Sequence, residues 1–257
     1  MSILRHLDAF CSKHQLRYFL AYGTLLGAVR HKGYIPWDDD IDLMMPRPDY
    51  LKFIELFDQG DQGTFKVVSI QNNRGYFANF AKIIDTRTVM YQDYEQVEKV
   101  QMGVYIDIFP MDGFPDDETE ARSVIKRAGR WSVAYRLAIR KFSARSSNWF
   151  KWVLMTLITV PFRIIGPYFF ISRLEAVGMA NKYDACTLVG CVTSRDTLEQ
   201  SFERKSLDEH VLLEFEGERY PAPASWDNYL SKKYGDYMTL PPESERGHHF
   251  YTVFWKD

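Results

Sequence analysis

Several features that would place a chain in a particular class are scarce or missing here. Cysteine is rare, with three residues in 257, at Cys11, Cys186 and Cys191. So sparse and odd a set argues against a disulfide-stabilised secreted domain and for reduced thiols in the cytoplasm. We expect Cys186 and Cys191 to be buried thiols, with a disulfide between them as the alternative. Residues 1–15 have the pattern of an amphipathic helix and lack the apolar core of a signal peptide, so secretion is not expected.

A strong charge of either sign is also lacking. The chain carries 32 Lys and Arg against 34 Asp and Glu, a net charge of −2. The overall charge therefore does not favour nucleic acid, and no nucleic-acid partner is expected. Apolar residues make up 46% and aromatic residues 16% of the chain, which excludes a disordered protein. A chain of this length can form one large domain, or one domain with a subdomain.

Up to about residue 112 the sequence mixes helical and strand patterns, which predicts α and β elements around one central sheet. Near the other end, residues 215–238 predict a short strand or turn followed by a helix. We expect helices at 3–14, 24–31 and 48–57, and strands at 17–22, 40–46, 65–70, 76–85, 88–92 and 103–110.

An uninterrupted apolar run of membrane-spanning length is missing, but a basic, partly apolar segment is present. Residues 121–174 contain eleven Lys or Arg and no Asp or Glu. Within them, residues 149–171 are strongly apolar and aromatic but are interrupted by Arg163 and two prolines, whereas a transmembrane helix needs about 20 continuous apolar residues. Two interpretations remain: a helical segment that contacts an anionic membrane surface, or a buried pair of core helices.

These patterns divide the chain into three parts. We expect a catalytic core at 1–120 and a basic and apolar helical segment at 121–198. The remainder, 199–257, is expected to pack back on the core.

Four aspartates in five positions, in the stretch "WDDDIDLMM", stand directly before an apolar run. If a strand begins early enough, Asp38, Asp40 and Asp42 share one of its faces, where they would converge on a hard cation such as Mg²⁺ or Mn²⁺. A solvated acidic turn is the simplest alternative. A calcium loop of the EF-hand type does not fit, because its sixth position is Leu43 instead of Gly and its twelfth is Asp49 instead of Glu.

A metal-dependent phosphoryl-transfer site needs further parts, and the sequence offers them. Gly23 and Thr24 lie at an expected strand-to-helix turn, where backbone N–H groups can hold a phosphate, although no Walker A lysine follows. Arg30, His31 and Lys32 supply cations before the aspartates. Asp107 stands between two isoleucines on a later expected strand, which is unusual for a carboxylate without a metal-binding or basic role. The alternative is an ordinary surface-facing residue.

Gly-Thr, then Asp-x-Asp on a strand, then a lone Asp on a later strand is the pattern of the nucleotidyltransferase superfamily. More specifically, "YFLAYGTLLGAVRHKGYIPWDDDIDLMMPRPDYLKF" resembles the signature of the LicD family, which includes fukutin and fukutin-related protein. Three further stretches fit the resemblance: "AKIIDTRTV", "GVYIDIFPMDGFP" and "YLSKKYGDYMTLPP". The resemblance implies an α+β fold, with a nucleotidyltransferase-like core, a mixed central sheet and an added helical segment.

The resemblance also implies an activity. LicD-like proteins transfer phosphocholine, and fukutin-like relatives ribitol phosphate, from a CDP-activated alcohol, so CDP-choline is expected ahead of CDP-ribitol and CDP-glycerol as donor. The acceptor is expected to be a hydroxyl of a cell-surface glycan precursor, such as that of teichoic acid or lipopolysaccharide, carried on a lipid. CMP leaves. The place of action is then the cytoplasm, at the inner face of the cell membrane.

The resemblance further assigns roles to residues. Asp40 and Asp42 become metal ligands and Asp107 the third carboxylate, while Gly23 and Thr24 hold phosphate. Asp38 is expected to be a ligand or to lie just behind the ligands.

Two more residues have an open interpretation. Lys82 is either a phosphate contact or an ordinary strand lysine that faces solvent. Trp37 either stacks on cytosine or choline or is a buried structural residue. His248 and His249 are weak candidates for a metal role.

Two other classes of protein compete with this interpretation. A glycosyltransferase would use Asp-x-Asp to hold the metal of a nucleotide sugar, but would explain neither Gly23-Thr24 nor Asp107. A non-catalytic membrane-surface module could use residues 121–174, but would not need a set of acidic residues in its core.

Overall fold

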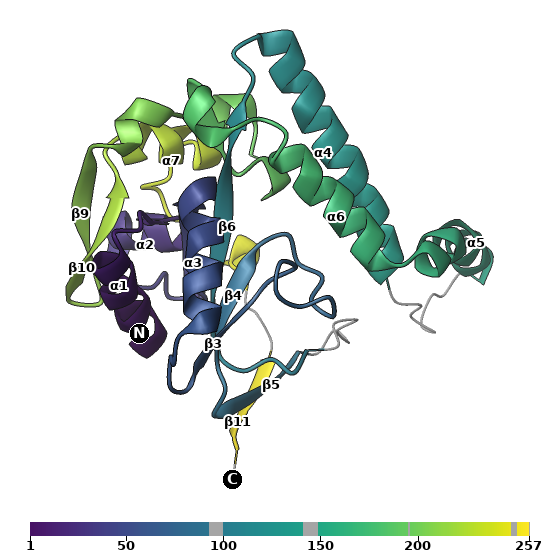
Figure 1. Cartoon of the computed structure of the whole chain (residues 1–257), viewed down its shortest axis with the longest axis horizontal. Coiled ribbons are helices and arrows are strands. Elements are labelled where there is room, and N and C mark those ends of the chain that lie inside the picture. The colour runs from purple at the N-terminus through teal and green to yellow at the C-terminus, as the bar shows by residue number, and fades with distance from the viewer. Residues whose placement is uncertain (93–99, 141–148, 195, 248–250, 257) are drawn as a thin grey trace.

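The centre of the molecule is a seven-stranded mixed sheet (Figure 1). A computed structural model describes residues 1–92, 100–140, 149–194, 196–247 and 251–256. The strand order is β1-β2-β6-β4-β3, with β7 on β6 and β8 on β7. Strands β2 and β6 run parallel, and the other neighbours run antiparallel. The strands are β1 (Phe19–Leu20), β2 (Asp42–Pro46), β3 (Phe65–Val68), β4 (Ala81–Asp85), β6 (Tyr105–Phe114), β7 (Leu188–Gly190) and β8 (Phe202–Glu203).

Three helices from the first part of the chain enclose the core around this sheet: α1 (Ser2–His14), α2 (Tyr22–His31) and α3 (Arg47–Gln59). Helix α1 buries one apolar stripe, including Leu4 and Leu7, as its amphipathic pattern requires. It ends at Gln15, which adopts the left-handed conformation with φ 55°. Helix α3 has a proline in its first turn, where the missing N–H costs little.

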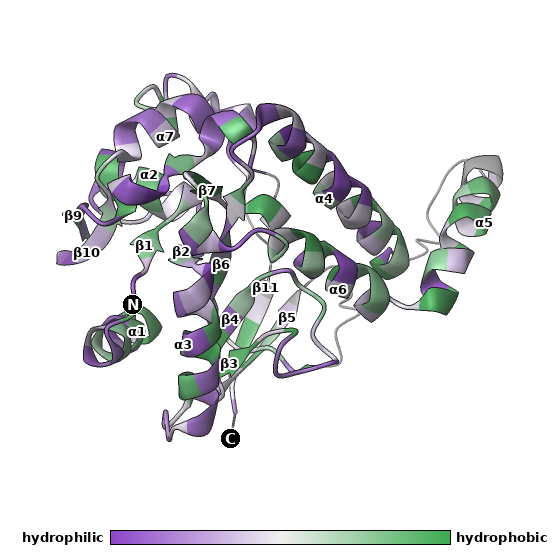
Figure 2. Cartoon of the chain, turned by 45° about the horizontal axis from the view of Figure 1, so that its top comes forward, coloured by the Kyte–Doolittle hydropathy of each residue, from purple (hydrophilic) through white to green (hydrophobic). Residues whose placement is uncertain are grey.

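A helical arm extends from the end of β6 (Figures 1 and 2). It consists of α4 (Glu118–Ile139), α5 (Trp149–Ile165) and α6 (Pro167–Gly178). Asp117 caps α4 by accepting a hydrogen bond of 2.8 Å from the Glu120 N–H. Helices α4 and α6 lie side by side. Helix α5 lies at the far end of that pair, away from the sheet in both views.

The C-terminal part packs back on the core. A hairpin of β9 (His210–Phe215) and β10 (Glu218–Pro223) turns at Glu216 and Gly217, both with positive φ. Helix α7 (Trp226–Tyr234) follows and buries Tyr229 and Leu230. Strand β11 (Tyr251–Trp255) pairs with β5 (Thr88–Gln92). Short 3-10 helices lie at Tyr183–Ala185, Val192–Ser194, Leu198–Gln200, Arg204–Leu207 and Glu243–Glu245.

The expected α+β class with a mixed central sheet and an added helical segment is confirmed. Several strand bounds were wrong. The strand expected at 17–22 is only Phe19–Leu20, because α2 already begins at Tyr22. The strand expected at 76–85 begins at Ala81, since the chain reaches it through bends and turns. Strand β6 continues to Phe114 because its second half finds a new partner in β7.

All three cysteines are free thiols, as expected, although Cys186 is only half-buried. The interpretation of residues 149–171 as a buried pair of core helices is wrong, since Trp152 and Phe169 each expose 41% of their surface. Among the described residues, no single helix is long and apolar enough to cross a membrane. The bent pair Trp152–Ile165 and Pro167–Ala185 passes that test jointly, with 77° between its two parts.

Candidate functional site

Charged residues form a row across the three central strands. Asp42 on β2 lies opposite Asp107 on β6, and Asp107 lies opposite Lys82 on β4. The Lys82 Nζ atom lies 2.6 Å from Asp107 Oδ1 and 3.4 Å from the centre of the Tyr105 ring. Asp107 and Lys82 expose only 7% and 8% of their surface. The third carboxylate is therefore held by a buried ion pair, and Lys82 does not face solvent.

Like charges gather at this row. Burial raises the pKa of Asp42 well above its usual range, and the neighbouring Asp40, Asp107 and Asp38 raise it further. Burial also raises the pKa of Asp107, although the Lys82 ammonium opposes that shift. The four carboxylates thus repel one another within a poorly solvated site, and one lysine compensates part of their charge.

The expectation that Asp38, Asp40 and Asp42 share one strand face was wrong. Strand β2 begins at Asp42, and residues 38–41 form the loop before it. This loop follows a turn in which the Asp38 N–H donates to the Ile35 carbonyl at 2.8 Å. Asp38 and Asp40 still act electrostatically on Asp42. The cluster is thus built from a loop and a strand end.

The start of α2 is fixed to this cluster. The Thr24 hydroxyl accepts a hydrogen bond of 2.8 Å from the Asp42 N–H, and Thr24 is buried. A Cβ atom on Gly23 would lie 2.4 Å from Asp38 Oδ2, so only glycine leaves that carboxylate in place. Tyr22, just before, has φ 45°, an uncommon value for a non-glycine residue. The structure therefore brings Gly23 and Thr24 to the aspartates, as the motif predicted; phosphate binding by them remains a prediction.

Arg30, His31 and Trp37 lie beside a cleft of about 490 Å³ that also includes Asp38. Arg30 Nη1 donates to the Tyr237 carbonyl at 2.7 Å and so holds the C-terminal segment. Burial and the Arg30 charge lower the pKa of His31, which favours the neutral imidazole over the cation. The guanidinium carbons of Arg246 and Arg30 lie 4.6 Å and 5.9 Å from the Trp37 ring centre. Trp37 is half-buried on the cleft wall.

Helix α7 contributes residues to the site that the sequence interpretation had not singled out. The Tyr234 hydroxyl has a raised pKa, first from burial and then from the charges of Asp42 and Asp38. Lys233 Nζ pairs with the buried Asp196 at 2.7 Å and lies 4.3 Å from the Tyr22 ring centre. The signal was present, because Lys233 and Tyr234 belong to the stretch "YLSKKYGDYMTLPP". His248 and His249 lie outside the described residues.

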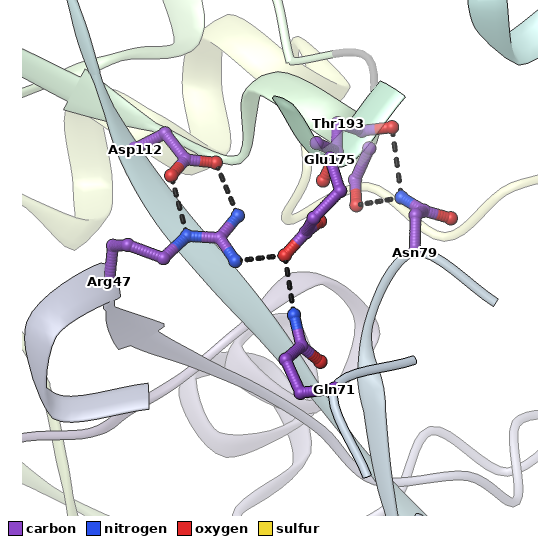
Figure 3. A network of polar contacts seen from close by, with 7 residues as sticks. Arg47, Gln71, Asn79, Asp112, Glu175 and Thr193 are labelled. Atoms are coloured by element: carbon purple, nitrogen blue, oxygen red, sulfur yellow. Dashed lines mark hydrogen bonds and ion pairs between the residues drawn. The ribbon is translucent and has the colours of Figure 1, made fainter. Parts of the chain in front are cut away.

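A second buried charge network joins the sheet to the arm (Figure 3). Arg47 makes two hydrogen bonds of 2.7 Å to the Asp112 carboxylate and a third to Glu175 on α6. Gln71 donates to the same Glu175 oxygen at 2.7 Å. Nearby, Asn79 bonds to the Thr193 carbonyl at 2.9 Å. Since Arg47 directly follows β2, this network fixes α6 to the strand that carries Asp42.

The donor set suits a hard divalent cation. Carboxylate oxygens are the ligands that Mg²⁺ and Mn²⁺ prefer, and a cation would relieve the repulsion that raises the pKa of Asp42. Within the described part of the chain, no three His, Cys, Asp or Glu side chains are already gathered as metal ligands. Asp107 Oδ1 is engaged by Lys82, which offsets part of its charge, and Asp38, Asp40 and Asp42 are the other carboxylates of the cluster.

A mixed sheet with carboxylates on adjacent central strands defines the class of the protein as a nucleotidyltransferase-type fold. The model of the family "LicD/FKTN/FKRP, nucleotidyltransferase domain" matches residues 15–150. The chain belongs to this family. The matched range contains α2, the aspartate loop, β2, β4 and β6, and thus every residue of the row across the sheet.

One individual relative matches nearly the whole chain, and two others match parts of it. The chain is 28% identical over 256 residues to the lipopolysaccharide cholinephosphotransferase LicD of Haemophilus influenzae, covering 97% of this chain and 92% of that protein. It is 28% identical to an uncharacterized protein of Rickettsia typhi, over 45% of this chain and 35% of the relative. An uncharacterized protein of Rickettsia prowazekii is 35% identical over 23% of each chain.

Proposed function

We propose that this protein is a metal-dependent phosphotransferase that moves phosphocholine from CDP-choline to a hydroxyl of a cell-surface glycan precursor, with release of CMP. The observation that carries the proposal is the row of Asp42, Asp107 and Lys82 across the central strands of a LicD-family chain. The similarity to the Haemophilus influenzae cholinephosphotransferase along nearly the whole chain supports choline ahead of ribitol or glycerol. We place the reaction in the cytoplasm, on a lipid-linked acceptor at the inner face of the membrane.

Asp40 and Asp42, with Asp38 or Asp107, would hold Mg²⁺ or Mn²⁺. The bound cation would supply the positive charge that offsets the diphosphate of the donor. The short α2 helix begins beside these carboxylates, and its first N–H groups, at Gly23 and Thr24, would bind a phosphate oxygen. Trp37, on the wall of the adjacent cleft, would stack on the cytosine base.

Asp107 acts on the acceptor directly, and Lys82 acts through Asp107. Asp107 accepts the proton of the acceptor hydroxyl while the hydroxyl oxygen attacks the phosphorus that carries choline. A new P–O bond forms, the P–O bond to CMP breaks, and CMP leaves with the bonding electrons. Lys82 keeps the Asp107 carboxylate in place through their 2.6 Å contact and offsets part of the local negative charge. Such a site works mainly by positioning and charge neutralisation.

A donor panel tests the proposal directly. The protein is incubated with Mg²⁺, an extract of lipid-linked glycans and one donor at a time: CDP-choline, CDP-ribitol, CDP-glycerol or UDP-glucose. CMP release is measured for the CDP donors and UDP release for UDP-glucose. We expect CMP release to be fastest with CDP-choline and to disappear in EDTA. UDP release without CMP release would instead identify a nucleotide-sugar glycosyltransferase.

Asp42→Asn is the matched negative control for that panel, and Asp39→Asn is its counterpart at an exposed position of the loop before β2. Asp42→Asn should lower CMP release by at least about a hundredfold, as removal of a group that binds charge in the transition state does. Asp39→Asn should keep most of the activity. Normal turnover by Asp42→Asn in Mg²⁺ would refute the mechanism.

A further inference from the structure

Helix α5 exposes large apolar side chains along its entire length. Leu157 exposes 66% and Ile164 80% of its surface. The exposed apolar surface continues onto the start of α6 through Tyr168 and Phe169. Figure 2 shows α5 as a largely hydrophobic helix at the end of the arm, away from the sheet. The exposed large apolar residues of α5 are Trp149, Trp152, Leu154, Leu157, Ile158, Val160, Ile164 and Ile165.

The form of this apolar surface indicates what covers it. A helix that is apolar on most sides is normally buried in a protein core or in lipid. On the side of α5 that faces the protein, Thr159 is buried, and the half-buried Phe162 packs on Phe170 of α6 at 5.4 Å between ring centres. The exposed positions occupy most of the remaining circumference, which is more than the single stripe that a protein groove would cover.

Three hydroxyl groups of α5 and α6 do not oppose contact with lipid. The Thr156 hydroxyl donates to the Trp152 carbonyl at 2.8 Å, and the Thr159 hydroxyl donates to the Met155 carbonyl at 2.9 Å. On α6, the Ser172 hydroxyl donates to the Tyr168 carbonyl at 2.7 Å. These hydroxyl hydrogens are satisfied within their own helix, as required where water is excluded.

Cations lie beside the apolar surface. Arg173 lies 5.2 Å from the Phe169 ring centre and Arg74 lies 5.8 Å from the Tyr168 ring centre. Residues 121–174 contain no Asp or Glu. Five exposed arginines belong to this neighbourhood by sequence or contact: Arg74, Arg136, Arg140, Arg163 and Arg173.

We propose that α5 and the first turn of α6 seat in the surface of an anionic lipid bilayer. The aromatic and aliphatic side chains would enter the boundary between headgroups and acyl chains, and the surrounding arginines would meet anionic headgroups. The 77° bend between α5 and α6 suits a pair that enters one side of a bilayer without crossing it. A second copy of this chain fits less well, because a symmetric contact through this surface would bring cations against cations. This proposal does not rest on the proposed enzyme activity.

Vesicle flotation tests the proposal with the full chain. Wild type is mixed with vesicles of phosphatidylcholine alone, or with a third of phosphatidylglycerol, at low and high salt. We expect it to float with the anionic vesicles and to be partly released by salt, since screening weakens only the electrostatic part.

The variant Leu157→Glu/Ile164→Glu should partition at least about tenfold less, because it places two charges in the apolar surface. Leu212→Glu is the matched control, a 55% exposed leucine on β9, and should float like wild type.

Two further measurements separate lipid binding from misfolding of the variant and from self-association. Quenching of wild-type tryptophan fluorescence by brominated lipid does not depend on the folding of any variant, and it should occur with anionic vesicles. Light scattering reports self-association in the absence of lipid. The proposal is overturned if wild type neither floats nor is quenched, or if the glutamate variant floats like wild type. It is also overturned if wild type is a dimer that the glutamate variant dissociates and neither binds vesicles, which would assign the surface to a second copy.

Discussion

A single side-chain hydrogen bond joins α2 to the strand that carries Asp42. Because the Thr24 hydroxyl accepts from the Asp42 N–H, Thr24→Val should leave that N–H without a partner. We expect a loss of about 1–3 kcal/mol in the free energy of unfolding and a fall in CMP release. Thr24→Ser keeps the oxygen and should retain most of both. Chemical denaturation and CMP release check this; equal stability of the Val and Ser variants would contradict it.

A substitution at Gly23 should affect the activity of the site more than the stability of the fold. Gly23→Ala should favour α2 by up to about 1 kcal/mol through helix propensity, yet its Cβ would displace the Asp38 carboxylate. We therefore expect stability within about 1 kcal/mol of wild type and clearly reduced CMP release. Gly129→Ala in α4 is the control, because no atom lies within 4 Å of its added Cβ. Full activity of Gly23→Ala would show that the position of Asp38 does not matter.

The three thiols differ in their environments. Burial raises the pKa of both Cys11 and Cys191, which are almost inaccessible. Cys186 also has a pKa raised by burial, but it is half-buried. Iodoacetamide should therefore alkylate Cys186 at least about ten times faster than the other two thiols in the native protein. Mass spectrometry of the labelled peptides measures the rates, with labelling in denaturant as reference; rapid native labelling of Cys11 would disprove the packing of α1.

At the scale of elements, one arginine connects β2, β6 and α6. Arg47→Met would leave Asp112 and Glu175 as buried carboxylates without their cation, so the free energy of unfolding should fall by about 3–5 kcal/mol. The combined variant Arg47→Met/Asp112→Asn/Glu175→Gln should recover much of that loss. Arg122→Met, which breaks exposed pairs on α4, should cost less than about 1 kcal/mol. Denaturant titration distinguishes them, and equal effects of Arg47→Met and Arg122→Met would refute the role of the network.

The same elements show what the sequence could and could not predict. The apolar residues on both sides of Asp107 predicted a strand there, because a local apolar pattern is enough to indicate a strand. The partnership of Asp107 with Lys82 depends on the register between β6 and β4, which no local pattern encodes. The start of β2 was placed two residues too early, at Asp40, because the alternating pattern does not show where pairing with the neighbouring strands begins. The Arg47 network joins residues more than 100 positions apart and was missed for the same reason.

Across the whole molecule, charge is unevenly distributed. Residues 121–174 carry only cations, while the chain as a whole has a net charge of −2, so the rest of the chain is acidic. Four aspartates, Asp38, Asp40, Asp42 and Asp107, act on one another around the start of β2. The residues that flank these aspartates, Ile41, Leu43, Ile106 and Ile108, are anchored in the main core, which extends from α1 to α7. This anchoring holds the like charges together. The folded protein without a cation therefore carries an electrostatic cost that a bound cation would remove.

That cost should be visible in global stability. In EDTA, Asp42→Asn should be more stable than wild type, by on the order of 1 kcal/mol, because it removes one of several partly buried like charges. In Mg²⁺ at about 100 times its Kd, wild type should gain about 2.7 kcal/mol, since ligand binding to the folded state alone shifts the unfolding equilibrium. Asp42→Asn should gain much less, so wild type becomes the more stable of the two proteins.

Asp39→Asn, altered at an exposed position of the loop, should follow wild type in both conditions. Thermal unfolding of the three proteins in EDTA and in Mg²⁺ measures these differences. If wild type melts at the same temperature in both buffers, the aspartate cluster does not bind Mg²⁺ in the free enzyme, and its role must be sought in contacts with the donor.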